Sequence, residues 1–183
     1  MSHPHSAGRE LALQYLYMHD ILAGREGQAF DEWVAHHHPA PPEEAVPFAR
    51  QLVEAVVQHG AELDLEIAAV ATNWNISRMA TVDRNIVRLG LAEMIAHAET
   101  SHKIIINEAV ELAKRYSMEE AGAFVNGLLD ALRVKLRPLS LQAWLDALRA
   151  RTYGDVTNRV KTPLPPRIAD PESLLFETYH SSQ

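Results

Sequence analysis

Cysteine is absent from this chain of 183 residues, and its absence removes several chemistries at once. Without a thiol the chain can form no disulfide, no thiolate-ligated metal site and no cysteine nucleophile. Long apolar runs are absent too, because none approaches the roughly 20 residues that a helix needs to cross a bilayer. The opening residues, MSHPHSAGRE, lack the apolar core of a signal peptide. We therefore expect a cytoplasmic protein with no membrane segment.

Positive charge is scarce, with 17 Lys and Arg against 24 Asp and Glu and a formal net charge of −7. Phosphate contacts need concentrated basic side chains, so this balance argues against a generic polyanion binder. The charge is nevertheless uneven. Residues 1–132 carry 9 basic and 19 acidic side chains, whereas residues 133–167 carry 8 basic and 2 acidic ones. Any electrostatic attraction for nucleic acid can therefore lie in the downstream segment.

Strand-like alternation of apolar and polar residues is also missing, so the chain is predicted to be all-α. With 47% hydrophobic residues, it can build one sizeable core or two small ones. The first helix is expected to bury an inward line of Leu11, Tyr15, Met18 and Leu22. Helices are predicted from about Ser6–Arg9 to Leu22, around Phe30–His37, from about Pro47 to a cap at Gly60, over about 63–74, from Thr81 to about Ala98, and in a hairpin at Ile104–Leu132.

The hairpin carries two local features that predict its geometry. Ser117 and Glu120 have the spacing of a capping box, which is expected to begin the second helix. Gly127 lies in mid-helix, where glycine costs about 1 kcal/mol relative to alanine. Together with Ala123 and Ala131, it forms a line of small residues one turn apart. We interpret that line as a site where another helix packs closely.

Three motifs in order carry a family resemblance. They are GRELALQYLY at positions 8–17, VDRNIVRLGLAEM at 82–94, and INEAVELAKRYS followed by FVNGLLD in the hairpin. They resemble the NusB family of bacterial transcription antitermination factors over roughly the first three quarters of the chain. The resemblance implies a NusB-like helical bundle of two packed halves, each with three to four helices, over residues 1–136. It also implies a protein without enzymatic activity.

The resemblance further implies two partners. One is a single-stranded boxA-type RNA, and the other is the small-subunit ribosomal protein NusE. In the family, the NusB protein and NusE bind this RNA together. They thereby help RNA polymerase, in its antitermination complex, to read through terminators during ribosomal RNA transcription. The implied partner-binding residues are Tyr17, Asp83 and Arg84. The implied RNA-binding residues are Arg9, Gln14, Tyr17, Arg84, Arg88, Glu120, Phe124 and Asn126.

Several of these residues have a second interpretation. Tyr17 suits a partly buried core position as well as a contact, and Phe124 lies on the apolar line of its helix. Asn126 can bond a nearby loop. The family commonly opens with a cluster of arginines, whereas this chain has His3, His5 and only Arg9. Either RNA binding is then weak without NusE, or the basic segment 133–167 compensates, or the chain is a scaffold or homodimer that has lost RNA affinity.

Other chemistry finds little support in the sequence. The run His36–His38 lacks the i, i+4 spacing of a helical metal site, so neither a native metal nor a cofactor is expected. An RNA methyltransferase is rejected because too little chain remains for a cofactor-binding α/β domain.

Residues 137–183 form an extension outside the usual family pattern. We predict one extra amphipathic helix there, at about 140–151, followed by a Pro-rich extended tail.

Overall fold

The computed structural model describes residues 3–22, 28–71, 78–136, 143–144 and 146. The chain divides into two compact units, residues 1–149 and 150–183, and all the described residues lie in the first. Within those residues the structure is helical without strands, as the sequence predicts. None of the helices found there is long and apolar enough to cross a bilayer. The elements are α1 (Pro4–Ile21), α2 (Phe30–His37), α3 (Ala45–Val70), α4 (Thr81–Ala96), α5 (His102–Tyr116) and α6 (Ala121–Lys135).

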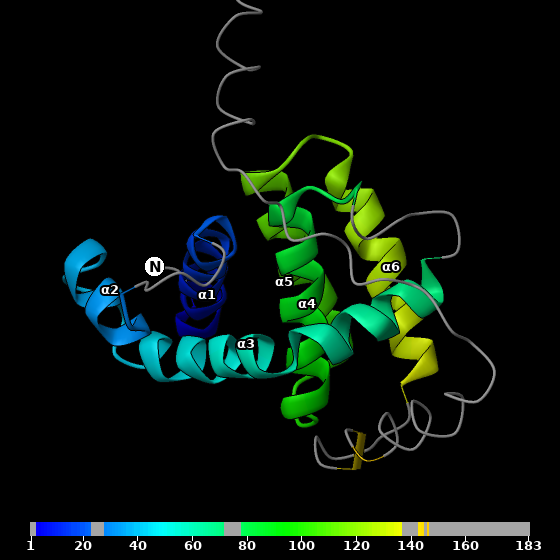
Figure 1. Cartoon of the computed structure of the whole chain (residues 1–183), viewed down its shortest axis with the longest axis horizontal. Coiled ribbons are helices and arrows are strands. Elements are labelled where there is room, and N and C mark those ends of the chain that lie inside the picture. Colours follow the sequence, from blue (N-terminus) through cyan, green and yellow to red (C-terminus); the bar gives the residue numbers. More distant parts are fainter. Residues whose placement is uncertain (1–2, 23–27, 72–77, 137–142, 145, 147–183) are drawn as a thin grey trace, which may run out of the picture. The chain divides into compact units, whose positions relative to one another are not determined.

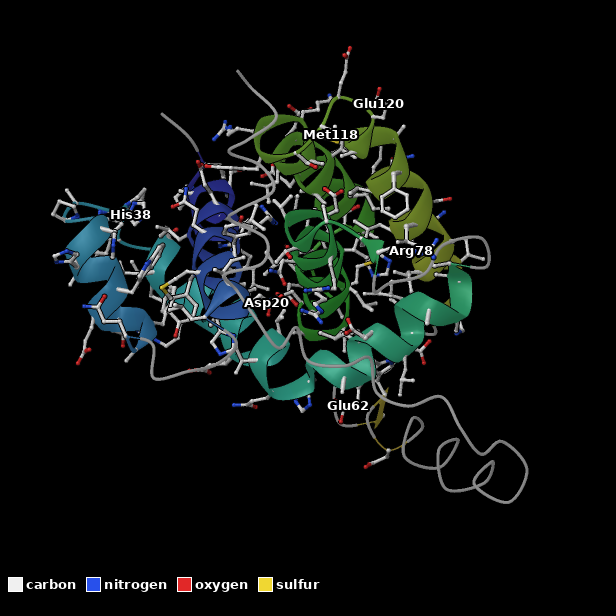
Figure 2. The ribbon with its side chains drawn as sticks, turned by 45° about the horizontal axis from the view of Figure 1, so that its top comes forward. Asp20, His38, Glu62, Arg78, Met118 and Glu120 are labelled. Carbon is white, nitrogen blue, oxygen red and sulfur yellow. The ribbon has the colours of Figure 1, made fainter. Side chains whose placement is uncertain are left out.

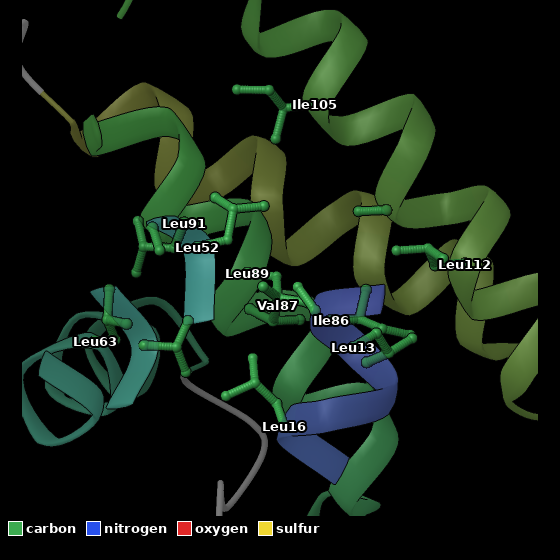
Figure 3. Close-up of a cluster of buried hydrophobic side chains, with 14 of the residues drawn as sticks. Leu13, Leu16, Leu52, Leu63, Ile86, Val87, Leu89, Leu91, Ile105 and Leu112 are labelled. Carbon is green, nitrogen blue, oxygen red and sulfur yellow. The ribbon is translucent and has the colours of Figure 1, made fainter. Parts of the chain in front are cut away.

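Helix α4 is the centre of the bundle and packs against α1, α3, α5 and α6. It is buried without interruption from Leu89 to Ile95, because its sequence is apolar on nearly every side. Helices α1 and α2 lie on one side, α5 and α6 on the other, and α3 runs across both groups (Figure 1). Side chains from α1, α3, α4 and α5 meet in one buried cluster (Figure 3). Because α1 and α4 pack against each other in this core, their polar faces lie side by side at its edge.

Helix α3 joins the two helices predicted on either side of Gly60, with a kink next to the predicted break. It is one helix of 26 residues with a kink at His59, whose φ and ψ are −121° and 21°. Leu52, Leu63 and Ile67 are all buried in one cluster, so the two halves of α3 face the same core on either side of the kink. The predicted extension to Trp74 lies in residues 72–77, outside the described part of the chain.

Helix α1 also differs from its predicted inward line. Leu11 and Tyr15 are buried as expected, but Leu22 lies past the end of the helix and is exposed. Leu13 and Leu16 are buried in its place. The reason is that α1 packs against α3 and α4 together, so it buries a wider face than a single stripe.

The α5–α6 hairpin is present, but both of its predicted local features are wrong. Ser117 ends α5, while Glu120 precedes α6 in a helical conformation and makes no side-chain cap hydrogen bond. Ala123, Gly127 and Ala131 are exposed, and a Cβ added to Gly127 would meet nothing within 4 Å. Helix α6 instead buries its larger side chains, Val125, Leu128, Leu129 and Leu132.

The chain beyond α6 returns to the core. Lys135 Nζ lies 2.8 Å from Glu66 Oε2 of α3, which fixes the end of α6 against that helix. Trp144 is helical and only 3% exposed, and it belongs to the hydrophobic cluster. This burial places position 144 in the core, while the helix at about 140–151 stays a prediction. Most of that helix and the predicted tail lie outside the described residues, and the domain boundary after residue 136 stays a prediction.

Candidate functional site

Two arginines on α4 are held by carboxylates from two other helices. Arg88 donates to Asp64 of α3 through Nε and Nη2, at 2.7 and 2.6 Å. Its Nη1 lies 3.2 Å from both Asp20 Oδ2 of α1 and Asn85 Oδ1. Arg84 Nη2 donates to the same Asp20 oxygen at 3.2 Å. We call Asp20, Asp64, Arg84 and Arg88 the α4 charge cluster, and its two positive and two negative charges balance.

The cluster keeps Arg88 firmly charged. Burial acts to lower the pKa of Arg88, but hydrogen bonds and charge interactions with Asp64 and Asp20 outweigh it and leave the pKa raised. The Arg88 and Arg84 side chains are only 13% and 19% exposed. Both guanidinium groups therefore lie at the surface with little of their charge available to a phosphate.

Polar atoms at the start of α4 are left without partners. Asp83 Oδ1, Arg84 Nε and Asn85 Nδ2 are buried, and none makes a hydrogen bond in the described structure. Buried polar atoms are nearly always bonded, so three unpaired atoms in consecutive residues mark an unusual place in the fold. Asp83 and Arg84 are two of the three residues that the sequence assigns to partner binding.

One polar face of α1 joins this cluster to the end of α5. Tyr17 is 46% exposed and lies three residues from both Gln14 and Asp20, so the three share a face. The structure thus places Tyr17 on the surface rather than in the core. Gln14 Nε2 donates to the Tyr116 hydroxyl of α5 at 3.0 Å. We call Gln14, Tyr17 and the α4 charge cluster the α1–α4 surface.

Tyr116 links α1 to α5 through a short chain of hydrogen bonds. Its hydroxyl donates to Glu10, and Arg115 Nη1 donates to the same carboxylate at 2.8 Å. Burial, followed by the hydrogen bond to Glu10, raises the pKa of Tyr116. The hydrogen bond to Glu10 likewise raises the pKa of Arg115. The carboxylate of Glu10 is therefore compensated by its neighbours.

Arg9 requires a correction, because the structure places it inside the protein. It is 5% exposed, and its Nε and Nη2 donate to Glu93 of α4 at 2.7 and 2.5 Å. Its Nη1 donates to Glu108 of α5 at 3.3 Å, and the Phe48 ring lies 5.3 Å from its guanidinium carbon. Arg9 joins three helices and presents no free charge to RNA.

The three candidates at α6 lie in different surroundings. Glu120 is exposed in the turn between α5 and α6, beside Met118 (Figure 2). Phe124 is half-buried and packs against the core, which supports its alternative interpretation. Asn126 is exposed and lines a pocket of about 570 Å³ with Lys103 and Arg133. Phe124 and Asn126 point to different sides because they are two residues apart on a helix.

The structure thus joins Arg84 and Arg88 to α1, the helix that carries Gln14 and Tyr17, through Asp20, and it buries Arg9. Sequence reasoning missed the residues that connect them. Asp20 had a usable signal, since it lies one turn beyond Tyr17. Asp64 had none, because only the tertiary packing of α3 on α4 brings it to Arg88. No group of three His, Cys, Asp or Glu side chains in the described residues is arranged to hold a metal ion.

Comparison with known proteins identifies relatives for most of the chain. The NusB family pattern matches residues 6–133. Transcription antitermination protein NusB of Myxococcus xanthus is 43% identical over 131 residues, which cover 70% of this chain and 94% of that protein. The protein of the same name from Anaeromyxobacter dehalogenans is 41% identical over 138 residues, covering 75% and 96%.

Solved structures agree with the helical architecture. A structure of antitermination factors NusB and NusE in complex with double-stranded RNA is 31% identical, with a TM-score of 0.65. The match covers 74% of this chain and 100% of that one. A structure of T. maritima NusB is 26% identical with a TM-score of 0.64, covering 72% and 92%. The predicted NusB-like fold is confirmed, and the chain belongs to the NusB family.

Proposed function

We propose that this chain is a transcription antitermination factor that acts by binding, without catalysis. Its partners are a boxA-type RNA and ribosomal protein NusE, within the RNA polymerase antitermination complex. Support comes from relatives that are named transcription antitermination proteins and from a related structure that holds NusB, NusE and RNA. The RNA in that structure is double-stranded, whereas we propose a single-stranded element of ribosomal transcripts for this chain.

The α1–α4 surface is the observation that carries this proposal. An exposed tyrosine ring can stack on an unstacked base, which is how proteins usually recognise single-stranded RNA. Tyr17 offers such a ring beside Gln14, whose amide can bond a base edge. We propose that Arg84 and Arg88 contact RNA at one end of this surface and that Glu120, Phe124 and Asn126 contact RNA beyond it. Asp83, Arg84 and Tyr17 are proposed to contact NusE.

RNA affinity is expected to depend on NusE. Arg9 is buried, and Arg84 and Arg88 are already paired with carboxylates, so a phosphate must compete with Asp20 and Asp64. A partner that docks on the start of α4 and draws Asp20 or Asp64 away from the arginines can shift this balance. We therefore propose weak RNA binding by the protein alone and tighter binding by its complex with NusE.

The test is an equilibrium titration of boxA RNA and a scrambled control, with and without NusE. We expect NusE to tighten boxA binding by about 5- to 150-fold, the usual size of coupling between two ligands. The scrambled RNA should gain much less. No boxA preference in the presence of NusE would contradict the proposal.

A second candidate is favoured by the balanced charge cluster itself. If the two α4 arginines never leave their carboxylates, the chain is an interaction scaffold or a homodimer with little RNA affinity. In that case it would bind NusE without any gain in RNA binding.

The contribution of the basic segment 133–167 to RNA binding can be tested by removing residues 138–183. Most of this segment lies outside the described residues. An unchanged salt dependence of RNA binding would exclude compensation by this segment.

A further inference from the structure

A second pocket, with a mixed polar and apolar lining, shares Gln14 with the α1–α4 surface and lies between α1 and the segment that joins α2 to α3. It has a volume of about 480 Å³. Its walls include Glu10 and Gln14 on one side, and His37, His38 and the Pro41–Pro42 pair on the other. Figure 2 marks His38 at the end of α2. This volume falls within the range of small-molecule sites, about 300–1,000 Å³.

On the histidine side of the pocket, the rings of His37 and His38 pack against the ring of Trp33. Trp33 is buried, and the His37 ring stacks on it with centroids 5.2 Å apart and planes 27° from parallel. The His38 ring lies at the same centroid distance from Trp33, tilted by 51°. The His36 ring also meets His37, with centroids 4.8 Å apart and planes 76° from parallel. His37 is nevertheless exposed and lines the pocket, so a planar ring that enters can pack against its exposed surface. His37 and His38 thus present aromatic surface to a cavity.

The hydrogen-bonding character of the walls follows from the bonds already in place. His37 Nδ1 lies 2.9 Å from the carbonyl oxygen of Trp33. A carbonyl can only accept, so Nδ1 carries the proton and Nε2 of the neutral ring is an acceptor. The Tyr116 hydroxyl has one proton, which it donates to Glu10, so its oxygen must accept from the Gln14 amide nitrogen. The amide oxygen of Gln14 is left as an acceptor.

Three polar groups from the residues that line this pocket therefore accept hydrogen bonds. They are Nε2 of His37, the amide oxygen of Gln14 and the carboxylate of Glu10, whose charge Arg115 and Tyr116 offset. A ligand that suits these walls is flat and presents N–H donors. Adenine, cytosine and guanine carry an exocyclic amine, whereas uracil presents two carbonyl oxygens and a single N–H.

We propose that this pocket receives one unstacked, amine-bearing nucleobase of the RNA, stacked on His37 and bonded to Gln14. The proposal rests on the proposed function, since the base belongs to the same RNA that crosses the α1–α4 surface. Gln14 belongs to both places, which makes the pocket a continuation of that surface. Base selection by the acceptor walls would let the chain prefer one RNA sequence with few free positive charges.

The test uses a boxA oligonucleotide with 2-aminopurine placed at one position at a time, bound to the protein in the presence of NusE. One position should show the fluorescence change of a base stacked in a protein site. His37→Ala and Gln14→Ala should each weaken binding by about tenfold and remove that signal. Replacement of the corresponding base by uracil should weaken wild-type binding by a similar factor. Gln51→Ala, which alters an exposed glutamine of α3 that does not line the pocket, is the control for Gln14→Ala and should bind like the wild type.

The outcomes separate this proposal from the one on which it rests. If the wild type binds boxA RNA with NusE, but both variants bind equally well and retain the signal, the pocket is not a base site and the proposed function stands. If the wild type shows no boxA binding even with NusE, both proposals are overturned. Thermal unfolding of each variant, compared with Gln51→Ala, excludes loss of binding through misfolding.

Discussion

Asp64 holds the guanidinium of Arg88 through two hydrogen bonds, at 2.7 and 2.6 Å, although the two residues lie on different helices. Asp20 adds a third contact from α1 at 3.2 Å and binds Arg84 as well. On the surface that we propose for RNA, the positive charges of Arg84 and Arg88 are thus already balanced by carboxylates of the same chain. Such a surface disfavours phosphates that arrive alone, because each phosphate must compete with a carboxylate for an arginine.

Asp20→Asn should release part of this charge. The neutral amide that replaces the carboxylate can no longer balance Arg84 and Arg88, so one further phosphate contact becomes available. The slope of log affinity against log salt for single-stranded RNA should then steepen by about 0.7, with tighter binding at low salt. The free energy of unfolding should fall by no more than about 1 kcal/mol, because the pair is partly exposed. RNA titrations at several salt concentrations measure the slope.

The control for that experiment is Asp31→Asn, which removes the exposed partner of Arg50, outside the α4 charge cluster. It should leave both the slope and the affinity unchanged. Equal effects of the two substitutions would mean that net charge alone, and not release of Arg84 and Arg88, governs RNA binding.

Arg9→Ala should act on stability rather than on RNA contact. The substitution leaves Glu93 buried without its bidentate partner and removes a link to Glu108. Breaking a buried ion pair from one side typically costs about 3–5 kcal/mol. Urea unfolding of the variant measures this loss, and Arg50→Ala, which breaks an exposed pair, should cost less than about 1 kcal/mol. A variant of wild-type stability that no longer binds RNA would instead restore Arg9 as a contact.

Replacement by alanine should raise the free energy of unfolding at one glycine, Gly127, and lower it at another, Gly8. A Cβ at Gly127 meets nothing within 4 Å, so Gly127→Ala should stabilise the protein by about 0.4–1 kcal/mol through better helix propensity. A Cβ at Gly8 would lie 2.7 Å from Phe48 Cδ1 and 2.9 Å from the carbonyl oxygen of Ala45. The backbone of α3 cannot easily move away, so Gly8→Ala should destabilise by about 1–3 kcal/mol. Denaturant midpoints of the two variants provide the comparison, and a loss at Gly127 would indicate a helix packed on α6.

Stability should fall at alkaline pH partly because of Tyr116. Burial and the hydrogen bond to Glu10 raise its pKa above the usual value of 10.0. The folded protein therefore keeps the hydroxyl protonated where the unfolded chain begins to lose its proton. This contribution is fully present below pH 10 and disappears as the pH rises through the folded-state pKa.

Unfolding by urea at a series of pH values above about 9, with Tyr116→Phe beside the wild type, isolates this effect. The variant should show a shallower decline, since it has no proton to lose at that position. Tyr15, whose pKa burial also raises, remains in both proteins and cancels in the comparison. Parallel curves for the two proteins would show that Tyr116 does not contribute.

The sequence predicts helices well where apolar spacing is long and regular. The stripe from Ile105 to Leu132 and the apolar run of α4 both give the correct elements, because burial at helical spacing leaves a direct pattern. Local rules were less reliable. The break predicted at Gly60 corresponds to a kink at His59, whereas Ser117 ends one helix without beginning the next.

The candidate site was predictable only in part, since its chemistry depends on contacts between distant residues. Tyr17, Arg84 and Arg88 could be picked out from the sequence as surface candidates. That both arginines are paired could not, because Asp20 and Asp64 reach them only after α1 and α3 have packed against α4. Arg9 shows the same limit, as its two carboxylate partners are 84 and 99 residues away in the sequence.

Photocrosslinking of boxA RNA in the complex with NusE tests most directly whether RNA crosses the α1–α4 surface. With 4-thiouridine in the RNA and adducts mapped by mass spectrometry, we predict crosslinks at Tyr17 and at neighbouring residues of α1 and the first half of α4. Adducts confined to the outer face of α3, where Val57 and Leu65 are exposed, would contradict this account.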